Sequence, residues 1–551
     1  MAQRNLSRQE LRRRRVTRRG AELQAAEEVR GALGTVHAPR EGEHRTWRQR
    51  ALALAAIMGP GLIVMVGDND AGGMATYAQA GQNYGYSLLW VLVLLVPVLI
   101  VNQEMVVRLG AVAGVGHAKL INERFGRFWG LFSVGDLFLL NFLTIATEFI
   151  GIGLAARYFG VSDDIAVPLA AVFLIGITLS GNFQRWERFM FVLLALNLGL
   201  IPLAVFTHPD LGSTFRGMVV PGIQGGISST AVLLVVSIVG TTVAPWQLFF
   251  QQSNVIDKRI TPRWLSYERT DTVVGAFVVV LGATCIIMAS AAAFDGTHAF
   301  GRFTDALGVA VGIAAHAGHW VGVIWAIVLL DASIIGASAV TLATSYAFGD
   351  IFGLRHSLNR GIRDAKVFYA SYAGLVVLAA AIVLIPNAPL GLITEAVQAL
   401  AGILLPSATV FLLLLCNDRA VLGPWVNKVW LNVVAAIIVG VLVVLSLILV
   451  VTTVVPGIDV PVLLIVLSAT LAFTLLAGGL WFAVRHRGRP SEIGRTYTQR
   501  EKLRWRMPPL ALLERSAWSR GRTWAMRAMA GYIGLSVLLL VVRAVELAIP
   551  R

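Results

Sequence analysis

Residues 64–76 of the chain read VMVGDNDAGGMAT, with apolar sequence on both sides of them. Inside a lipid bilayer each unpaired backbone group costs several kcal/mol, so a helix is interrupted at that depth only where protein or a water-filled cavity surrounds it. A carboxylate at the same depth costs roughly 2.5 kcal/mol or more. The carboxylates of Asp68 and Asp70, followed by the Gly72-Gly73 pair, therefore indicate a cation site at a broken helix inside a membrane protein.

A second interrupted segment lies at residues 227–250, where GTTVAPWQ occupies positions 240–247. Pro245 has no N–H and its ring displaces the carbonyl group one turn back, which frees backbone oxygens. Two interrupted apolar segments at matching positions of two halves are the best sequence indication of a secondary transporter with inverted repeats. We therefore expect two inverted five-helix units, residues 51–207 and 208–416.

The composition is that of a membrane protein. Of its 551 residues, 56% are hydrophobic and only 14% are charged, and the mean hydropathy is +0.72. We predict an all-α polytopic membrane protein with about 12 transmembrane helices, because twelve apolar segments approach the ~20 residues that a bilayer demands. They are residues 51–81, 87–109, 130–157, 165–181, 188–207, 227–251, 271–293, 318–348, 366–385, 391–416, 429–455 and 461–484.

The formal net charge of +15 is unevenly distributed over the loops. Basic clusters such as residues 108–127, 258–269 and 355–366 fall on one side of the predicted membrane, whereas Asp163 and Asp164 lie on the other. Cytoplasmic loops carry the excess of Lys and Arg, so we expect a plasma-membrane protein with a cytoplasmic N-terminus. No nucleic-acid partner is expected, since no aromatic interleaving or folded module accompanies the basic residues.

Basic tails precede and follow the apolar part of the chain. Residues 1–50 lack the apolar core of a cleaved signal, and we expect a disordered cytoplasmic arm that touches anionic lipid, at about 1 kcal/mol per basic residue. Helices 11 and 12 occupy residues 417–484, and residues 485–551 form the second tail. Within it, residues 528–542 are either a thirteenth crossing or an amphipathic helix in the interface. A monomer is the favoured oligomeric state.

Several motifs resemble the NRAMP family of divalent-metal transporters. They are GPG at 59–61, DAGGMAT at 70–76, QAG at 79–81, YGYSLLW at 84–90, RLG at 108–110, the second break at 240–247 and NDR at 417–419. The similarity covers most of residues 50–455. It implies a LeuT-like fold without enzymatic activity, in which a divalent metal ion is held between the unwound parts of helices 1 and 6.

Departures from the family pattern fall on the metal ligands. The family has Asp-Pro-Gly-Asn at the first break, and here Asp70 is kept while Gly73 replaces the asparagine. The family has Met-Pro-His at the second break, and here Ala244 takes the place of the methionine and Trp246 that of the histidine. Thr241 falls where the family offers a backbone carbonyl to the ion.

The remaining candidate ligands are oxygens. They are the carboxylate of Asp70, backbone carbonyls at 67–69 and Thr241, and the side-chain amides of Asn69 and Gln247. Without a thioether the preference for soft metals is lost, and oxygen ligands suit magnesium, which keeps several waters. The small residues at positions 73 and 244 would widen the cavity for those waters. We expect import of Mg2+, and also of Mn2+, as in the NRAMP-related magnesium transporters, with no resident cofactor.

Three acidic residues near this site have alternative interpretations. Asp70 is a ligand or only the cap of the half-helix that follows. Asp68 is an outer ligand or a charge in the vestibule. Asp331, in the eighth helix, lies on the ion path or is a buried and bonded group. Away from the site, Glu104 is expected to form an i,i+4 pair with Arg108.

Proton coupling in the family uses an Asp-x-x-Glu pair on helix 3 and the histidine of Met-Pro-His. Glu148 matches the glutamate, but Ile145 stands at the aspartate position and Trp246 at the histidine. A relay needs titratable groups within reach of one another, so we expect transport without proton coupling. Glu148 then belongs to the ion path or bonds a neighbouring Ser or Thr.

Four other functions remain as alternatives. The first is a proton-coupled Mn2+/Fe2+ symporter of the NRAMP type. The second is a LeuT-like amino-acid or amine transporter, although an aspartate in the break is unfavourable for a substrate carboxylate. The third is a membrane-embedded metal-dependent hydrolase that uses Asp68 and Asp70, although the sequence lacks His ligands and a nucleophile elbow. The fourth is a channel, which would need a continuous pore, whereas two broken helices favour alternating access.

Overall fold

The computed structural model describes residues 28–37, 46–386, 388–455, 457–486 and 497–513, with a few positions between 523 and 534. Most of the first 45 residues therefore lie outside the described residues. The same holds for most of the tail after residue 513, including nearly all of the predicted helix at 528–542.

The first half of the chain begins with a two-stranded hairpin and continues in helices. These elements are β1 (Glu28–Gly31), β2 (Gly34–His37), α2 (Trp47–Ile57), α3 (Pro60–Val66), α4 (Ala71–Tyr84), α5 (Leu89–Ala113), α6 (His117–Phe125), α7 (Arg127–Tyr158), α8 (Asp163–Leu179), α9 (Phe183–Asn197), α10 (Leu200–Phe206) and α11 (Leu211–Val219).

The second half is helical in all its described elements. They are α12 (Ser229–Thr242), α13 (Pro245–Asp257), α14 (Leu265–Phe294), α15 (Ala306–Ala317), α16 (His319–Ile351), α17 (Lys366–Val383), α18 (Leu390–Cys416), α19 (Arg419–Leu422), η1 (Gly423–Trp425), α20 (Val429–Val454), α21 (Val460–His486), α22 (Gln499–Arg504) and η2 (Leu510–Leu512).

Each of the twelve predicted apolar segments corresponds to helical structure. Among the described residues, ten helices are long and apolar enough to cross a membrane, or up to eleven if one bent pair is a single span. The predicted segment 165–181 is α8, whose 17 residues fall just short of that length. The chain is therefore a multi-pass membrane protein.

The first apolar segment was expected to have one break and has two. The helices α2 and α3 meet at an angle of 54°, at Gly59, whose φ of 146° is one that residues with a Cβ rarely adopt. A Cβ at this position would also overlap the carboxylate of Glu187. The expected break follows at residues 67–70, between α3 and α4.

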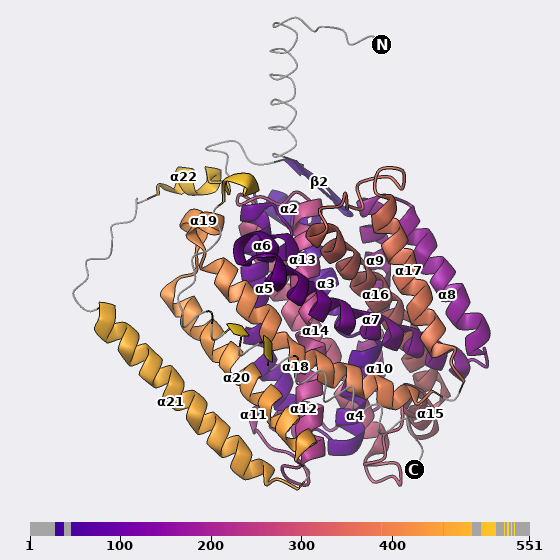
Figure 1. The fold of residues 1–551 in the computed structure, drawn as a ribbon. Coiled ribbons are helices and arrows are strands. Elements are labelled where there is room, and N and C mark those ends of the chain that lie inside the picture. The colour runs from indigo at the N-terminus through magenta and orange to yellow at the C-terminus, as the bar shows by residue number, and fades with distance from the viewer. Residues whose placement is uncertain are drawn as a thin grey trace, which may run out of the picture.

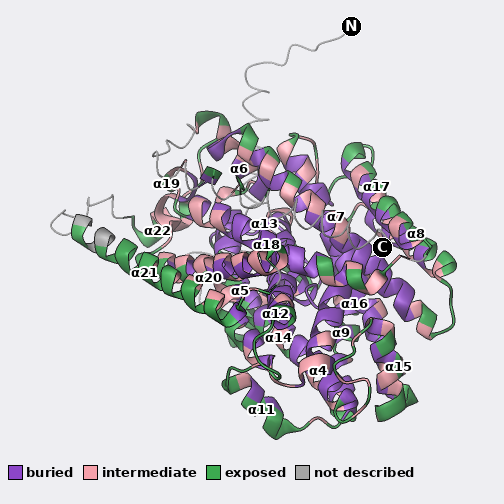
Figure 2. Ribbon diagram, turned by 60° about the horizontal axis from the view of Figure 1, so that its bottom comes forward, coloured by how far each residue is buried: buried purple, intermediate pink, exposed green. Residues whose placement is uncertain are grey.

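Burial decreases from the broken helices outward, as Figure 2 shows. Of the most apolar window in α12 and α13 taken together, 94% is buried, whereas the corresponding figure for α21 is 6%. In Figure 1, α21 runs along the outside of the bundle beside α20, while α12, α14 and α18 occupy its middle. The second broken helix is thus enclosed by protein, which an interrupted helix requires.

The N-terminal arm was predicted to be disordered, but residues 28–37 are folded. These residues form an antiparallel hairpin in which Val29 pairs with Val36. Val29 is fully buried and packs in a cluster with Ile57, Val255 and Trp264. The alternation of apolar and polar residues is too short in this stretch to be recognised in the sequence, and tertiary packing stabilises the hairpin.

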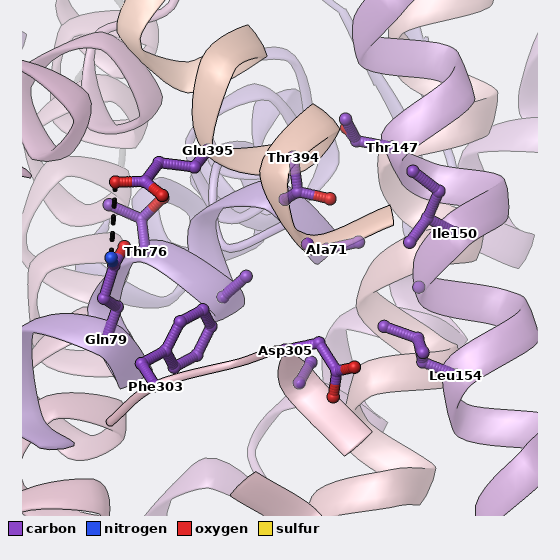
Figure 3. Close-up of a pocket in the computed structure, with 14 residues that line it drawn as sticks. Ala71, Thr76, Gln79, Thr147, Ile150, Leu154, Phe303, Asp305, Thr394 and Glu395 are labelled. Carbon is purple, nitrogen blue, oxygen red and sulfur yellow. Dashed lines mark hydrogen bonds between the residues drawn. The ribbon is translucent and has the colours of Figure 1, made fainter. Parts of the chain in front are cut away.

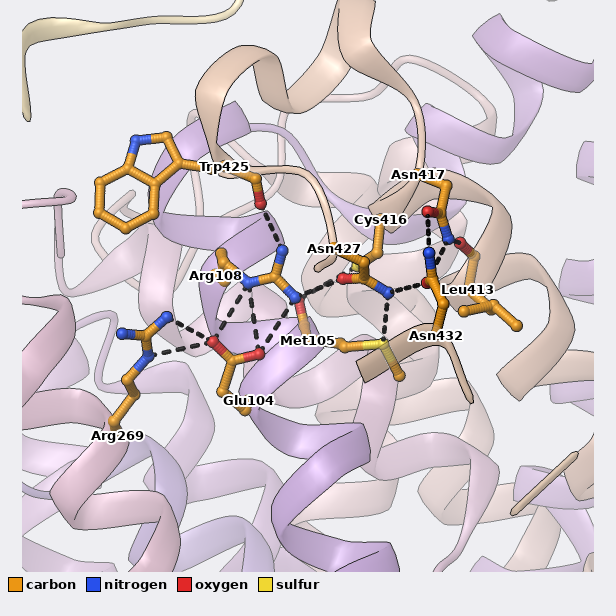
Figure 4. A network of polar contacts seen from close by, with 10 residues as sticks. All are labelled: Glu104, Met105, Arg108, Arg269, Leu413, Cys416, Asn417, Trp425, Asn427 and Asn432. Atoms are coloured by element: carbon orange, nitrogen blue, oxygen red, sulfur yellow. Dashed lines mark hydrogen bonds and ion pairs between the residues drawn. The ribbon is translucent and has the colours of Figure 1, made fainter. Parts of the chain in front are cut away.

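Polar side chains fix the end of α5 to the loop after α18 (Figure 4). The predicted pair exists, since Arg108 donates to Glu104 at 3.1 Å, and Arg269 binds the same carboxylate at 2.6 Å. Arg108 also donates to the side chain of Asn427 at 2.6 Å and to the carbonyl of Trp425. Asn427 and Asn417 both donate to Oδ1 of Asn432, at 2.9 and 2.8 Å, so the RLG and NDR motifs lie at one structural junction.

Candidate metal-ion site

The first break is organised by Asp70. Its backbone is extended, and Oδ1 accepts a hydrogen bond from the backbone N–H of Gly73 at 2.7 Å, so Asp70 caps α4. Aspartate is among the preferred caps because it satisfies otherwise unpaired N–H groups of the first turn. The capping role considered from the sequence is therefore real. It does not exclude a ligand role, since a carboxylate oxygen has more than one lone pair.

Buried oxygens without a hydrogen-bond partner gather around this break. Within the described part of the protein, they are both carboxylate oxygens of Asp68, Oδ1 of Asn69, Oγ1 of Thr241 and Oε1 of Glu148. Buried polar atoms nearly always have a partner, and each exception requires an explanation. All of these oxygens can accept a hydrogen bond or bind a cation.

The amide of Asn69 is held in an orientation that suits a ligand. Its Nδ2 donates to the backbone carbonyl of Val279 at 3.2 Å, which directs the donor atoms of the amide toward α14. A Cβ on Gly282 would overlap this same Nδ2, so the close approach of α14 depends on glycine. The oxygen of Asn69 is then left without a partner.

The second break contains a backbone carbonyl without a helical partner and a buried aromatic ring beside the first break. The helical partner of the Thr241 carbonyl would be the N–H of residue 245, which is a proline and has none. Trp246 is almost fully buried, and its ring lies close to Gly67, where an added Cβ would be 3.2 Å from the indole. The indole therefore closes the break on the side of α13.

Gln247, a candidate ligand, is occupied by structural hydrogen bonds. Its Nε2 donates to the carbonyl of Thr242 at 3.3 Å, and its Oε1 accepts from Nε2 of Gln103 at 2.9 Å. The hydroxyl groups of Tyr77 and Thr242 are also 2.7 Å apart. These contacts connect α13 to α12 and α5, and α4 to α12. The sequence alone does not indicate that Tyr77 makes the last of these contacts.

The space expected at position 73 is already filled. A Cβ on Gly73 would overlap the carbonyl oxygen of Asp68 and would be 3.1 Å from Oγ1 of Thr241. The expectation that this glycine widens the cavity for water is wrong, because the backbone of the break folds into the volume of the missing side chain. At Ala244, which is 6% exposed, the side chain is short and the backbone is extended.

Glu148 contacts the break through a backbone group rather than through a Ser or Thr. Its Oε2 accepts a hydrogen bond from the N–H of Ala71, the first residue of α4, at 3.1 Å. A Cβ on Gly336 would come within 2.5 Å of this oxygen and 2.8 Å of the Cβ of Asp70. The helices α7 and α16 therefore meet α4 at its N-terminus, where carboxylates are favourable.

Gln398 is a further residue at the break that sequence reasoning missed. It lies on α18, is 3% exposed, and its Nε2 has no hydrogen-bond partner in the described structure. A Cβ on Gly72 would overlap its amide. A glutamine within a long apolar helix is the available signal, but the sequence does not show which side of α18 faces the break.

Asp331 is buried, at 4% exposure, and neither of its carboxylate oxygens has a partner among the described residues. The side chain of Asn197 is its polar neighbour, and both interpretations of Asp331 stay predictions. No set of three His, Cys, Asp or Glu residues in the described ranges is arranged to hold a metal. Asp331 thus does not join Asp68 and Asp70 in a single cluster of acids.

A pocket leads from one face of the protein toward the first break (Figure 3). It is narrow and is lined by Ala71, Thr76, Gln79, Asp305 and Glu395, among others. Nε2 of Gln79 donates to Oε1 of Glu395 at 3.3 Å across it. A wider pocket on the same face shares Asp305 with it. The break is therefore approached from the face that carries the acidic loops.

Two interrupted helices that meet at buried oxygens inside a multi-pass bundle define a LeuT-like secondary transporter. The similarity to solved structures agrees with this fold class. A manganese transporter from Eremococcus coleocola superposes with a TM-score of 0.60 at 20% sequence identity, covering 82% of this chain and 97% of that one.

The family follows from the sequence comparisons. The model described as "Natural resistance-associated macrophage protein-like" matches residues 61–452, and the chain belongs to this Nramp family. A divalent metal cation transporter MntH from Xylella fastidiosa is 28% identical over 436 residues, which are 75% of this chain and 88% of that protein. Another MntH, from Ralstonia nicotianae, is 30% identical over 398 residues, or 68% and 86% of the two chains.

Proposed function

We propose that the protein imports a divalent cation, preferentially Mg2+, by alternating access and without proton coupling. The observation that supports this best is the set of partnerless buried oxygens at the first break, which faces a second break without sulfur. The named relatives carry divalent metal cations, and the Nramp membership of this chain makes the same class of cargo the first expectation.

The proposed ligands are all oxygens. They are the carboxylates of Asp70 and Asp68, Oδ1 of Asn69 and the backbone carbonyl and hydroxyl of Thr241. Gln247 and Glu148 act instead as positioning residues, because their hydrogen bonds hold the two breaks in place. Trp246 is the wall of the site.

Selectivity for magnesium follows from the ligand chemistry. Magnesium takes carboxylate, carbonyl and water oxygens and loses its waters reluctantly, whereas a thioether would favour softer metals. With Ala244 at the methionine position, this preference is absent, and Mn2+ also fits an oxygen site. The similar protein from Eremococcus coleocola is a manganese transporter, so a proton-coupled Mn2+ symporter is the alternative that the experiment must separate.

Lack of proton coupling is proposed from the surroundings of Glu148. The family's aspartate and histidine positions hold Ile145 and Trp246, which do not titrate. One oxygen of Glu148 is already bound to the N–H of Ala71. A proton relay requires a neighbouring group that can accept the proton, and neither of these two positions supplies one. The titratable group that does lie beside Glu148 is Asp70, which the proposal assigns to the ion.

The test is transport by the purified protein in liposomes. Internal Mg2+, Mn2+ or Ca2+ is measured with a metal-sensitive dye, internal pH with a second dye, and the membrane potential is set by a potassium gradient with valinomycin. We expect Mg2+ uptake that follows the potential and leaves internal pH unchanged. Uptake of Mn2+ with acidification, and none of Mg2+, would replace the proposal by the proton-coupled symporter.

A further inference from the structure

A buried ion pair lies at the end of the bundle where the basic loops gather. Nζ of Lys258, the residue that follows α13, is 2.6 Å from Oε1 of Glu187 on α9, and both side chains are fully buried. The same Nζ donates to the backbone carbonyl of Met58 at 2.7 Å, at the bend between α2 and α3. One ammonium group therefore joins three elements: the first broken helix, the second broken helix and α9.

The N-terminal hairpin binds the other side of this pair. The backbone N–H of Ala32, at the turn of the hairpin, donates to Oε2 of Glu187 at 2.6 Å, and Nε of Arg188 donates to the carbonyl of Ala32 at 3.2 Å. At Gly31 an added Cβ would overlap the carbonyl oxygen of Ala56 and would lie 3.1 Å from the stem of Lys258. The hairpin thus lies across the gap between α2 and α9.

The start of α3 is held by a second carboxylate. Asp271 on α14 accepts the N–H groups of Gly59 at 3.2 Å, Gly61 at 2.7 Å and Leu62 at 3.3 Å. Glu268, one turn earlier on α14, is fully buried and neither of its oxygens has a partner within the described ranges. The bend between α2 and α3 is therefore fixed from α9, α13 and α14 together.

We propose that residues 28–37 act as a strap that keeps the first broken helix closed on the face predicted to be cytoplasmic. The pocket at the first break opens toward the acidic loops on the opposite face. Release of an ion on the strapped face requires α2 and α3 to separate from α9 and α13. That movement breaks the contacts of Lys258 with Met58 and removes the surface on which Gly31 lies, so the strap must detach for release.

The inference rests on the alternating access assumed in the proposed function, and its test does not use transport. Both native cysteines, Cys285 and Cys416, are buried. We would introduce the reporter Ala53→Cys on α2, at a position that is 1% exposed, and measure the rate at which a hydrophilic maleimide labels the full-length protein in open membrane sheets. Protein without the reporter measures the background from the native cysteines.

Two pairs of variants decide the outcome. Gly31→Ala inserts a methyl group against Ala56 and is matched by Leu33→Ala, because Leu33 lies in the same hairpin and is 61% exposed. Deletion of residues 1–37 is matched by deletion of residues 1–27, which keeps the hairpin. We expect several-fold faster labelling with Gly31→Ala and with the longer deletion, and parental rates with both controls.

Equal labelling rates in both members of each pair would overturn the strap. If Gly31→Ala does not yield monodisperse protein, the two deletions decide by themselves, since they leave every membrane helix unchanged. A protein that labels as expected but does not transport Mg2+ would contradict the proposed cargo and leave the strap intact. Thus the two proposals fail by different measurements.

Discussion

The two helix breaks are built from different chemistry, although both interrupt a helix inside the bundle. The first, at residues 67–70, carries the carboxylates of Asp68 and Asp70. The second, at residues 243–244, carries no charge and supplies a carbonyl freed by Pro245. Both breaks present the C-terminal, negative end of a half-helix to the site, which favours a cation. On the proposed function, the first break therefore balances the charge of the ion, and the second adds only neutral ligands from Thr241.

The largest expected effect comes from Asp70. Asp70→Asn keeps the cap of α4, because asparagine caps helices about as well as aspartate, and it removes the negative charge. We expect uptake in liposomes to fall about 100-fold or more, since even residues outside the first ligand shell contribute 10–100-fold to metal affinity. Its melting temperature should stay near that of the parent.

Asp70→Ala provides the comparison for this prediction. It removes the cap as well as the charge, and we expect an additional loss of about 1 kcal/mol in the free energy of unfolding. Wild-type-like uptake by either variant would mean that Asp70 only caps the helix and that the two breaks do not differ in the way described.

The second prediction concerns Asp68, whose carboxylate has no partner among the described residues. Asp68→Asn should weaken Mg2+ binding about tenfold or more. The same change should raise the thermal stability of the ion-free protein, because a buried charge without a partner is costly. Opposite shifts in affinity and in stability are the signature of a ligand.

Thr241→Val, which removes a partnerless oxygen at the second break, is the matched control for Asp68→Asn. The hydroxyl group that Thr241→Val removes carries no charge. The loss of Mg2+ affinity, measured by titration calorimetry, should therefore be smaller for Thr241→Val than for Asp68→Asn. An equal or larger loss with Thr241→Val would contradict the assignment of charge balance to the first break.

The third prediction tests the second break as the element that sets selectivity. Ala244→Met returns a thioether to this position, and we expect the ratio of Mn2+ to Mg2+ uptake to rise on the order of tenfold, the scale of one pocket side chain. Ala244→Leu adds similar volume without sulfur and should reduce both ions without that rise. Equal ratios in both variants would show that sulfur does not contact the ion.

The substitution Gly73→Asn, which restores the family's asparagine, would change more than the ligand. A side chain there would overlap the carbonyl of Asp68, so the break itself must move. Any change in selectivity with Gly73→Asn therefore combines a new ligand with a displaced backbone, which is why Ala244 is the better position.

Sequence reasoning recovered the elements whose signals are local. The apolar segments, the break at residues 67–70 and the Glu104–Arg108 pair follow from composition and spacing, and the structure contains all of them. The contacts of Gln247 and Glu148 do not follow, because they join positions far apart in the chain. The bend at Gly59 depends on a tertiary partner, Asp271, which the sequence does not identify.

Residues 28–37 are a second example of structure that the sequence alone does not predict. Four-residue strands carry too little pattern to be distinguished from a charged arm, and an isolated hairpin is marginal in water. Its stability comes from the burial of Val29 and from the contact of Ala32 with Glu187, both of which need the folded bundle.

The smallest effect is expected at Glu148, and it tests whether the first break carries a proton as well as an ion. In Glu148→Gln the amide oxygen can still accept the N–H of Ala71, so the start of α4 stays in place. A divalent ion gains about 4.6 kcal/mol on entry at 100 mV, inside negative, from the ~2.3 kcal/mol that this potential supplies per charge. That energy sustains a gradient of over a thousandfold without protons, so uptake by the variant should stay within a few-fold of the parent.

The measurement is potential-driven Mg2+ uptake with a pH dye inside the liposomes, and neither protein should acidify them. Acidification that accompanies Mg2+ entry in the parent and disappears in Glu148→Gln would assign the proton to Glu148 and contradict uncoupled transport. If the acidification persists in the variant, the buried carboxylate of Asp331 is the next one to test, with Asp331→Asn in the same assay.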